Sequence, residues 1–142
     1  MIERTLAIIK PDAMRSGSSG RIVTMIQDAD FHILGAKMTK ISEAQAGAFY
    51  EVHKERPFYP ALVKYMCSGP IIVMALEKDN AIADYRKLIG NTDPQKADEG
   101  TVRKLYGTNI EANAVHGSDS VENGNIEIAF FFSRSELVGN QC

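Results

Sequence analysis

The chain has 142 residues, of which 44% are hydrophobic and 24% are charged; this predicts one globular domain over residues 1–142 and excludes disordered and collagen-like chains. Sixteen basic and 18 acidic residues leave a net charge of −2, so nucleic-acid binding is not indicated, although a local basic cleft is compatible with this balance. No aliphatic run spans a membrane, no signal peptide is recognisable and two cysteines make no disulfide framework, so we expect a cytoplasmic protein.

The first elements that the sequence predicts are a strand and a helix. Residues Thr5–Ile9 read as a short buried strand, which Pro11 ends in a turn. A small-residue loop follows at Ser16–Gly20, and Ser18 or Ser19 caps the helix after it. The apolar stripe of this helix is Ile22, Met25, Ile26 and Ala29.

A second strand and a helical segment follow. Phe31–Ile41 reads as the strand, with Gly35 as a candidate β-bulge. Ser42 and Gln45 fit a capping box, which predicts a helix to about His53. A further short helix is expected to begin near Pro60. Its apolar positions are Leu62, Val63 and Met66.

Ile71–Leu76 is β-branched and apolar and predicts a strand buried on both faces. Asp79 is a candidate cap for a helix that ends at Gly90, and a polar loop over Asn91–Gly100 leads to a helical turn around Thr101–Tyr106. Residues 121–132 show helical spacing, although a strand over 126–132 is an alternative. We favour the helix, and the order of elements predicts an α+β sandwich with helices packed on one antiparallel sheet.

Three histidines are candidates for chemistry. His32 starts a strand among apolar neighbours and His53 lies at a helix end, so a structural role is favoured for both. His116 ends an apolar triplet and precedes a run of small hydrogen-bonding residues, so function and structure are equally favoured there. Cysteines and histidines lack metal-ligand spacing, and the common phosphate-binding glycine motifs are absent from the sequence.

Basic residues beside turns are the remaining candidates. Taken singly, most of them are expected to be solvated surface residues. Lys10 is the exception, because a lysine at the end of a buried strand lies where sheet edges open onto sites. Arginine suits phosphate because its guanidinium group donates two parallel hydrogen bonds. The residues in question are Lys10, Arg56, Arg86 and Arg103, with Thr92 in the polar loop.

Four segments together resemble the nucleoside diphosphate kinase family, with similarity from about Glu3 to Val138. Asn-x-x-His-Gly-Ser-Asp is a highly specific motif, and its position relative to the other three adds to that specificity. The segments are Thr5–Asp12 (TLAIIKPD), Arg56–Tyr59 (RPFY), Ser68–Pro70 (SGP) and Asn113–Ser120 (NAVHGSDS).

The resemblance implies a ferredoxin-like βαββαβ fold with helices covering a four-stranded antiparallel sheet. It implies Mg²⁺-dependent transfer of the γ-phosphate of a nucleoside triphosphate, such as ATP, to a nucleoside diphosphate. The route is ping-pong, with a phosphohistidine on His116, whose neutral imidazole attacks without prior deprotonation. An inactive homologue that binds nucleotides or nucleic acid is the alternative.

The resemblance also implies roles around the histidine. Lys10 would meet the transferring phosphate, and Tyr50 would lie beside the imidazole. Glu127 would orient the ring, and Ser118 would support it by hydrogen bonding. No metal ligand would come from the chain, because the nucleotide phosphates would be the main ligands of the Mg²⁺ ion.

Nucleotide-binding positions follow from the same match. Asn113 would bond the ribose hydroxyl, and Phe58 and Ile110 would clamp the base without reading its edge. The arginines and Thr92 would bind phosphate. The matched positions are Lys10, Phe58, Arg86, Thr92, Arg103, Ile110 and Asn113.

The chain departs from the family pattern at three places, of which the first concerns local loop contacts and the other two concern assembly. Glu111–Ala112 replaces a Gly-Arg pair of animal members, and the loop Gln95–Glu99 is more charged than usual. The chain stops soon after Leu137–Val138, without the longer tail of hexameric eukaryotic members. We expect a homo-oligomer, with a tetramer favoured over a hexamer, and Cys142 as a reduced thiol, with an interchain bridge as the alternative.

Overall fold

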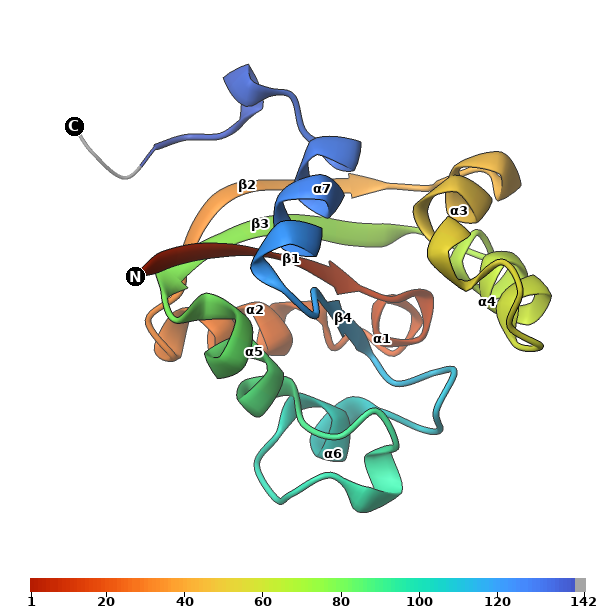
Figure 1. Ribbon diagram of the computed structural model, residues 1–142. Coiled ribbons are helices and arrows are strands. Elements are labelled where there is room, and N and C mark those ends of the chain that lie inside the picture. The colour runs from red at the N-terminus through yellow and green to blue at the C-terminus, as the bar shows by residue number, and fades with distance from the viewer. Residues whose placement is uncertain (140–142) are drawn as a thin grey trace.

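The apolar, β-branched segments form the strands of one antiparallel sheet in a computed structural model that describes residues 1–139 (Figure 1). The strands are β1 (Ile2–Ile9), β2 (His32–Thr39), β3 (Ile71–Asp79) and β4 (Val115–Gly117). They lie in the order β2-β3-β1-β4, and each neighbouring pair is antiparallel. The predicted ferredoxin-like α+β fold is therefore confirmed. Cys142 lies outside the described residues.

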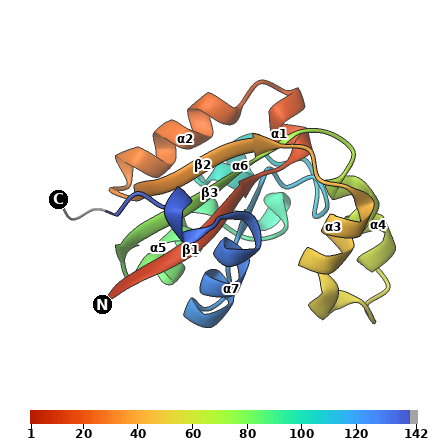
Figure 2. The ribbon, with the colours of Figure 1, turned by 90° about the horizontal axis from the view of Figure 1, so that it is seen from above.

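Helices cover both faces of this sheet. They are α1 (Pro11–Arg15), α2 (Ser19–Asp28), α3 (Glu43–Phe49), α4 (Tyr59–Met66), α5 (Ala81–Ile89), α6 (Val102–Tyr106) and α7 (Val121–Phe131). Side chains of α2 and α5 share one buried cluster with the sheet, and side chains of α3, α4 and α7 share the other. Helices α3 and α4 form a hairpin beyond one end of the sheet (Figure 2). No helix within residues 1–139 is long and apolar enough to cross a membrane.

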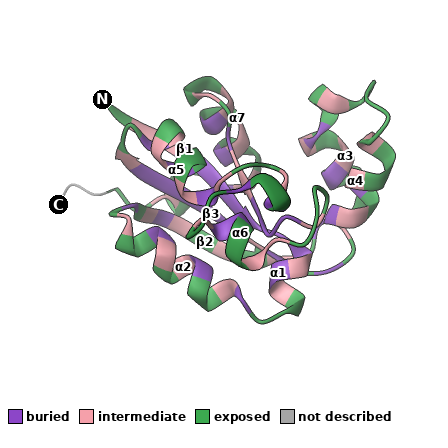
Figure 3. Cartoon of the chain, turned by 90° about the horizontal axis from the view of Figure 1, so that it is seen from below, coloured by how far each residue is buried: buried purple, intermediate pink, exposed green. Residues whose placement is uncertain are grey.

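The core lies on both faces of the central strands. Ala7 and Ile9 pack under α2 and α5, whereas Leu6 and Ile8 pack against α7 and the hairpin. Strand β3 is buried on both faces from Val73 to Leu76, as predicted for the run Ile71–Leu76, although Ile72 is only partly buried. Figure 3 shows this burial along β1 and β3, with exposed residues on the outer faces of the helices.

Local signals in the sequence are confirmed at several points. The pairing of β2 with β3 shifts register between Ile33 and Gly35, which is the predicted bulge. Ser42 and Gln45 form the reciprocal capping box at the start of α3. Residues 121–131 form a helix rather than a strand, and Ser120 caps it by accepting from the backbone N–H of Asn123.

Strand β1 begins at Ile2 and not at Thr5, β2 is shorter than predicted, and the boundaries of three helices also differ from the predictions. Pro11 opens the short helix α1 instead of a turn, because proline lacks an N–H and suits the first turn of a helix. Helix α2 begins inside the predicted loop, and the Ser18 hydroxyl contacts Ser16 Oγ at 2.8 Å instead of capping the helix. Helix α3 ends at Phe49, and Glu51–His53 continue as a 3₁₀ turn.

The cap of α5 is also different from the prediction. Asp79 is the last residue of β3 and pairs with the N-terminal amine of Met1. Asn80 takes the N-cap position with a φ of 59°, while the Glu3 carboxylate accepts from the backbone N–H of Ile82 at 3.1 Å. The cap therefore comes from β1, because β3 is longer than predicted and stays paired with β1 to its end.

Candidate active site

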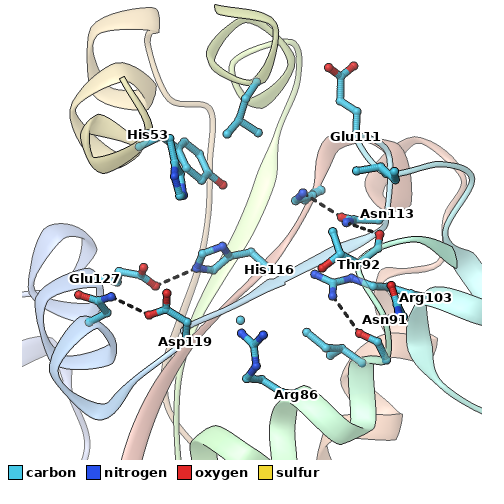
Figure 4. A pocket seen from close by; sticks show the side chains of 18 of the residues that line it. His53, Arg86, Asn91, Thr92, Arg103, Glu111, Asn113, His116, Asp119 and Glu127 are labelled. Carbon is cyan, nitrogen blue, oxygen red and sulfur yellow. Dashed lines mark hydrogen bonds and ion pairs between the residues drawn. The ribbon is translucent and has the colours of Figure 1, made fainter. Parts of the chain in front are cut away.

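A cavity of about 1160 Å³ opens beside the end of the sheet where β4 pairs with β1 (Figure 4). Its walls come from the α3–α4 hairpin, the end of α5 with the loop after it, residues 110–113 and the first turns of α7. Every residue that the family resemblance placed in the site lines this cavity, except Ser118, which is buried behind it. The further candidate Arg56 is exposed and does not line the cavity. The lining members are Lys10, Tyr50, Phe58, Arg86, Thr92, Arg103, Ile110, Asn113, His116 and Glu127.

His116 stands at the centre of the cavity. Strand β4 pairs it with Ile8 of β1, and its ring lies toward α7 (Figure 4). Its Nε2 is 2.8 Å from Glu127 Oε1, and the Ser118 hydroxyl donates to the same oxygen at 2.8 Å. A carboxylate accepts only from a protonated nitrogen, so the neutral ring keeps its lone pair on Nδ1. No described residue hydrogen-bonds Nδ1, so this nitrogen is free to act as a nucleophile.

Two aromatic rings pack around the imidazole. The ring centroids of Phe49 and Tyr50 lie 5.5 Å and 6.2 Å from that of His116, both edge-on. Burial raises the pKa of Tyr50, with a further contribution from the charge of Glu127, so the phenol stays protonated. Its hydroxyl has no partner within residues 1–139. The two rings restrict rotation of the imidazole. The Tyr50 hydroxyl remains available as a hydrogen-bond donor.

Lys10 brings a buried amine to the opposite wall. Its Nζ donates to Asn113 Oδ1 at 2.9 Å, and Asn113 Nδ2 donates to the Thr92 carbonyl at 3.0 Å. Burial, followed by the positive charge of Arg103, lowers the pKa of Lys10 to about 8. An anion in the cavity would offset both costs, so this wall favours a phosphate group.

Arg103 is largely committed to the fold. Its guanidinium donates to the Gly90 carbonyl at 3.0 Å and to the Val115 carbonyl at 2.9 Å. Burial lowers its pKa, and the nearby charge of Arg86 lowers it too. Arg103 therefore fastens α6 to β4 while adding positive charge to the cavity, and Arg86 faces His116 from α5 (Figure 4).

Exposed apolar side chains form part of the cavity wall. Phe58 and Ile110 line it, although they are 50% and 61% exposed and have no full cover from the rest of the chain. His53 lies against Phe58, with ring centroids 5.5 Å apart, so it belongs to the cavity rather than only to a helix end. His32 is exposed at the start of β2 and does not line the cavity. An exposed aromatic ring beside an aliphatic side chain suits a flat ligand.

Sequence reasoning missed some of the surrounding residues. Phe49 and Asp119 line the cavity, and the Asp119 carboxylate accepts from Asn123 Nδ2 at 2.6 Å. Asp12 lies behind the wall and bonds to the backbone of Ala114. Both aspartates stand inside the segments that carry the family resemblance, but spacing along the chain does not show which side chains turn toward a common point.

The fold and cavity together define a class of protein: an anion-binding α+β domain that presents a histidine nitrogen to its ligand. The family description "Nucleoside diphosphate kinase" matches residues 3–137. A protein of that name from Chlorobaculum tepidum is 56% identical over 96% of this chain and 98% of its own. One from Chloroherpeton thalassium is 54% identical over 99% of this chain and 100% of its own.

Solved structures give the same result. The nucleoside diphosphate kinase of Aquifex aeolicus superposes with a TM-score of 0.95 at 42% identity, covering 97% of this chain and 100% of that one. The enzyme from Halobacterium salinarum, in complex with CDP, has a TM-score of 0.94 at 37% identity, covering 100% of this chain and 95% of that one. The chain belongs to the nucleoside diphosphate kinase family.

Proposed function

We propose that this protein transfers the γ-phosphate of a nucleoside triphosphate to a nucleoside diphosphate through a phosphohistidine on His116. The observation that carries the proposal is the His116–Glu127 pair, which commits Nε2 and leaves the Nδ1 lone pair for attack. Family membership supports the same reaction. Both half-reactions use one cavity, so the two nucleotides never need to bind together.

The reaction has two balanced steps. In the first, His116 Nδ1 attacks the γ-phosphorus, the bond to the β,γ-bridging oxygen breaks, and the nucleoside diphosphate leaves with that electron pair. In the second, a terminal oxygen of another diphosphate attacks the phosphorus and the P–N bond breaks. Glu127 stabilises the positive charge that the ring gains, and Lys10 offsets negative charge on the transferring group.

The remaining lining residues would position the nucleotide. Asn113 would bond the ribose hydroxyl, and Thr92, Arg86 and Arg103 would bind the phosphates. Phe58 and Ile110 would hold the base between an aromatic and an aliphatic side chain. Neither side chain forms hydrogen bonds with base edges, so broad tolerance for the base follows. The structure of the Halobacterium salinarum enzyme is a complex with CDP, which supports nucleotide binding by this chain.

Mg²⁺ would enter with the nucleotide. Within residues 1–139, no three histidine, cysteine or acidic side chains are grouped to hold a metal ion. The cavity lining fits a Mg²⁺ ion that is coordinated mainly by the phosphate oxygens of the nucleotide. The Asp119 carboxylate lies on the cavity wall and could add an oxygen ligand. Bound in this way, Mg²⁺ would supply charge neutralisation of the phosphates. The sequence predicts a homo-oligomer, with a tetramer favoured over a hexamer. It also predicts a cytoplasmic location, and both remain predictions.

Labelling without an acceptor tests the proposal. The protein is incubated with Mg²⁺ and γ-labelled ATP, and we expect label on the protein that is acid-labile and base-stable. Added GDP should chase the label into GTP, and His116→Ala should take up none. If folded, nucleotide-bound wild-type protein takes up no label, or if His116→Ala is labelled equally, the assignment of His116 is wrong.

A further inference from the structure

The backbone immediately before His116 is strained. Ala114 has a φ of 73°, a left-handed value that is rare for a residue with a Cβ atom. The N–H of Val115 donates to the carbonyl of Asn113 at 2.9 Å, which closes a three-residue γ-turn centred on Ala114. A γ-turn with positive φ at its centre is the rare and strained form. Strain of this kind persists only where the surroundings enforce it.

The segment after β1 enforces this turn from both sides. The N–H of Lys10 donates to the Ala114 carbonyl at 2.9 Å. The N–H of Ala114 donates to Asp12 Oδ2 at 3.0 Å, across 102 positions of sequence. Ala114 is fully buried, so loss of either bond would leave a buried backbone group without its partner. The turn therefore depends on two polar partners, of which only Asp12 uses a side chain.

The other oxygen of Asp12 is held by the hairpin. The Tyr65 hydroxyl donates to Asp12 Oδ1 at 2.5 Å, and the N–H of Asp12 donates to the Tyr65 hydroxyl oxygen at 3.0 Å. Tyr65 belongs to α4, whose N-cap residue is Phe58. Burial raises the pKa of Tyr65, and its bond to Asp12 raises it further, so the phenol remains a donor at neutral pH.

We propose that Asp12 is a positioning residue for phosphoryl transfer: it holds the γ-turn at Ala114, which sets the direction of His116, and Tyr65 keeps Asp12 in place. The inference rests on the proposed function. Asp12 acts through the backbone and not through the imidazole or the nucleotide. The chain of contacts also links the hairpin at the mouth of the cavity to the strand that carries the histidine.

Asp12→Ala tests the role by separating chemistry from binding. We expect the single-turnover rate of phosphohistidine formation to fall about 100-fold, because a displacement of about 1 Å at a reacting group has that effect. Affinity for ADP, measured by calorimetry, should change much less than the rate. Asp12→Asn keeps an oxygen for the Ala114 N–H and should retain most of the rate. Tyr65→Phe should give an intermediate loss.

A second substitution distinguishes positioning from simple stability. Glycine adopts positive φ without steric cost. The double variant Asp12→Ala, Ala114→Gly should therefore form phosphohistidine about tenfold or more faster than Asp12→Ala alone. Glu3→Ala is the matched control, since it removes another carboxylate bond to a backbone N–H, that of Ile82, and neither residue lines the cavity. Glu3→Ala should lower the melting temperature and leave the rate unchanged.

Hydrogen exchange provides a readout that needs no catalysis. Protection of the Ala114 and Val115 amides should be lost in Asp12→Ala and kept in Glu3→Ala. Wild-type rates in folded Asp12→Ala, or no rescue by glycine, would overturn the proposal. If Asp12→Ala does not fold, unchanged rate and exchange in Tyr65→Phe would overturn it. If wild-type protein takes up no phosphate, the proposed function fails, while exchange still decides whether Asp12 holds the turn.

Discussion

Lys10 shows how a single buried charge prepares a binding site. Its side chain is 7% exposed and faces an amide oxygen of Asn113 rather than a carboxylate. Burial is the main reason that its pKa falls to about 8, with repulsion from Arg103 second; Asp12 and Glu111 act in the opposite direction. A bound phosphate would favour the charged amine and raise this pKa again.

Nucleotide binding should therefore take up a proton near pH 8. The free protein loses the Lys10 proton as pH rises through about 8, while the bound form keeps it. Affinity for ADP should accordingly fall as the pH rises above 8. Calorimetry in two buffers of different ionisation enthalpy measures the uptake directly. Lys10→Gln should abolish it and His116→Ala should not; equal uptake in Lys10→Gln would contradict the assignment.

At the scale of elements, the short strand β4 depends on close contact with α5. Gly117 lies against the ring of Tyr85, and a Cβ atom there would be 2.8 Å from two ring carbons and 3.2 Å from Ile89 Cδ1. Tyr85 is fully buried, so its ring has no space into which it can move. Since β4 carries His116, this contact also places the histidine.

Gly117→Ala should destabilise the protein by about 1–3 kcal/mol, as expected for overpacking, and slow phosphohistidine formation. Urea unfolding and the labelling assay measure the two effects. Gly20→Ala is the matched control, because nothing lies within 4 Å of the added Cβ and alanine favours the helix. A Gly117→Ala protein as stable as the Gly20→Ala protein would show that β4 and α5 can separate without cost.

At the scale of the whole molecule, the cavity exists only when distant segments meet. The hairpin, α5, β4 and α7 each supply part of its wall. The unfolded chain therefore cannot bind nucleotide with comparable affinity. Binding should stabilise the fold as a whole through mass action.

ADP at one hundred times its Kd should stabilise the fold by about 2.7 kcal/mol, seen as a rise in Tm. His116→Ala should show the same rise while transferring no phosphate, because the imidazole attacks the γ-phosphate that ADP lacks. Thermal unfolding with and without ADP measures this. If ADP does not raise the Tm of His116→Ala, the imidazole contributes to binding of the diphosphate.

Much of the architecture was determined by the sequence alone. The buried strand over Ile71–Leu76, the capping box of Ser42 and the helix over residues 121–131 follow from hydrophobic periodicity and hydrogen bonds between close neighbours. These signals are local, because they depend on side chains within a few positions of one another. The members of the site were named instead through a family resemblance that extends over almost the whole chain.

Only the tertiary structure decided what depends on long-range contact. The sequence predicted Asp79 as the cap of α5, yet Glu3 caps it from β1, 79 positions before Ile82. Asp12 follows the proline at which the sequence predicted a turn, and its side chain bonds to the Ala114 backbone. Alanine carries no preference for positive φ, so no pattern could predict the turn before His116. Lys10 and Asp12 hydrogen-bond to Ala114, and these segments meet only because β1 pairs with β4 in the folded chain.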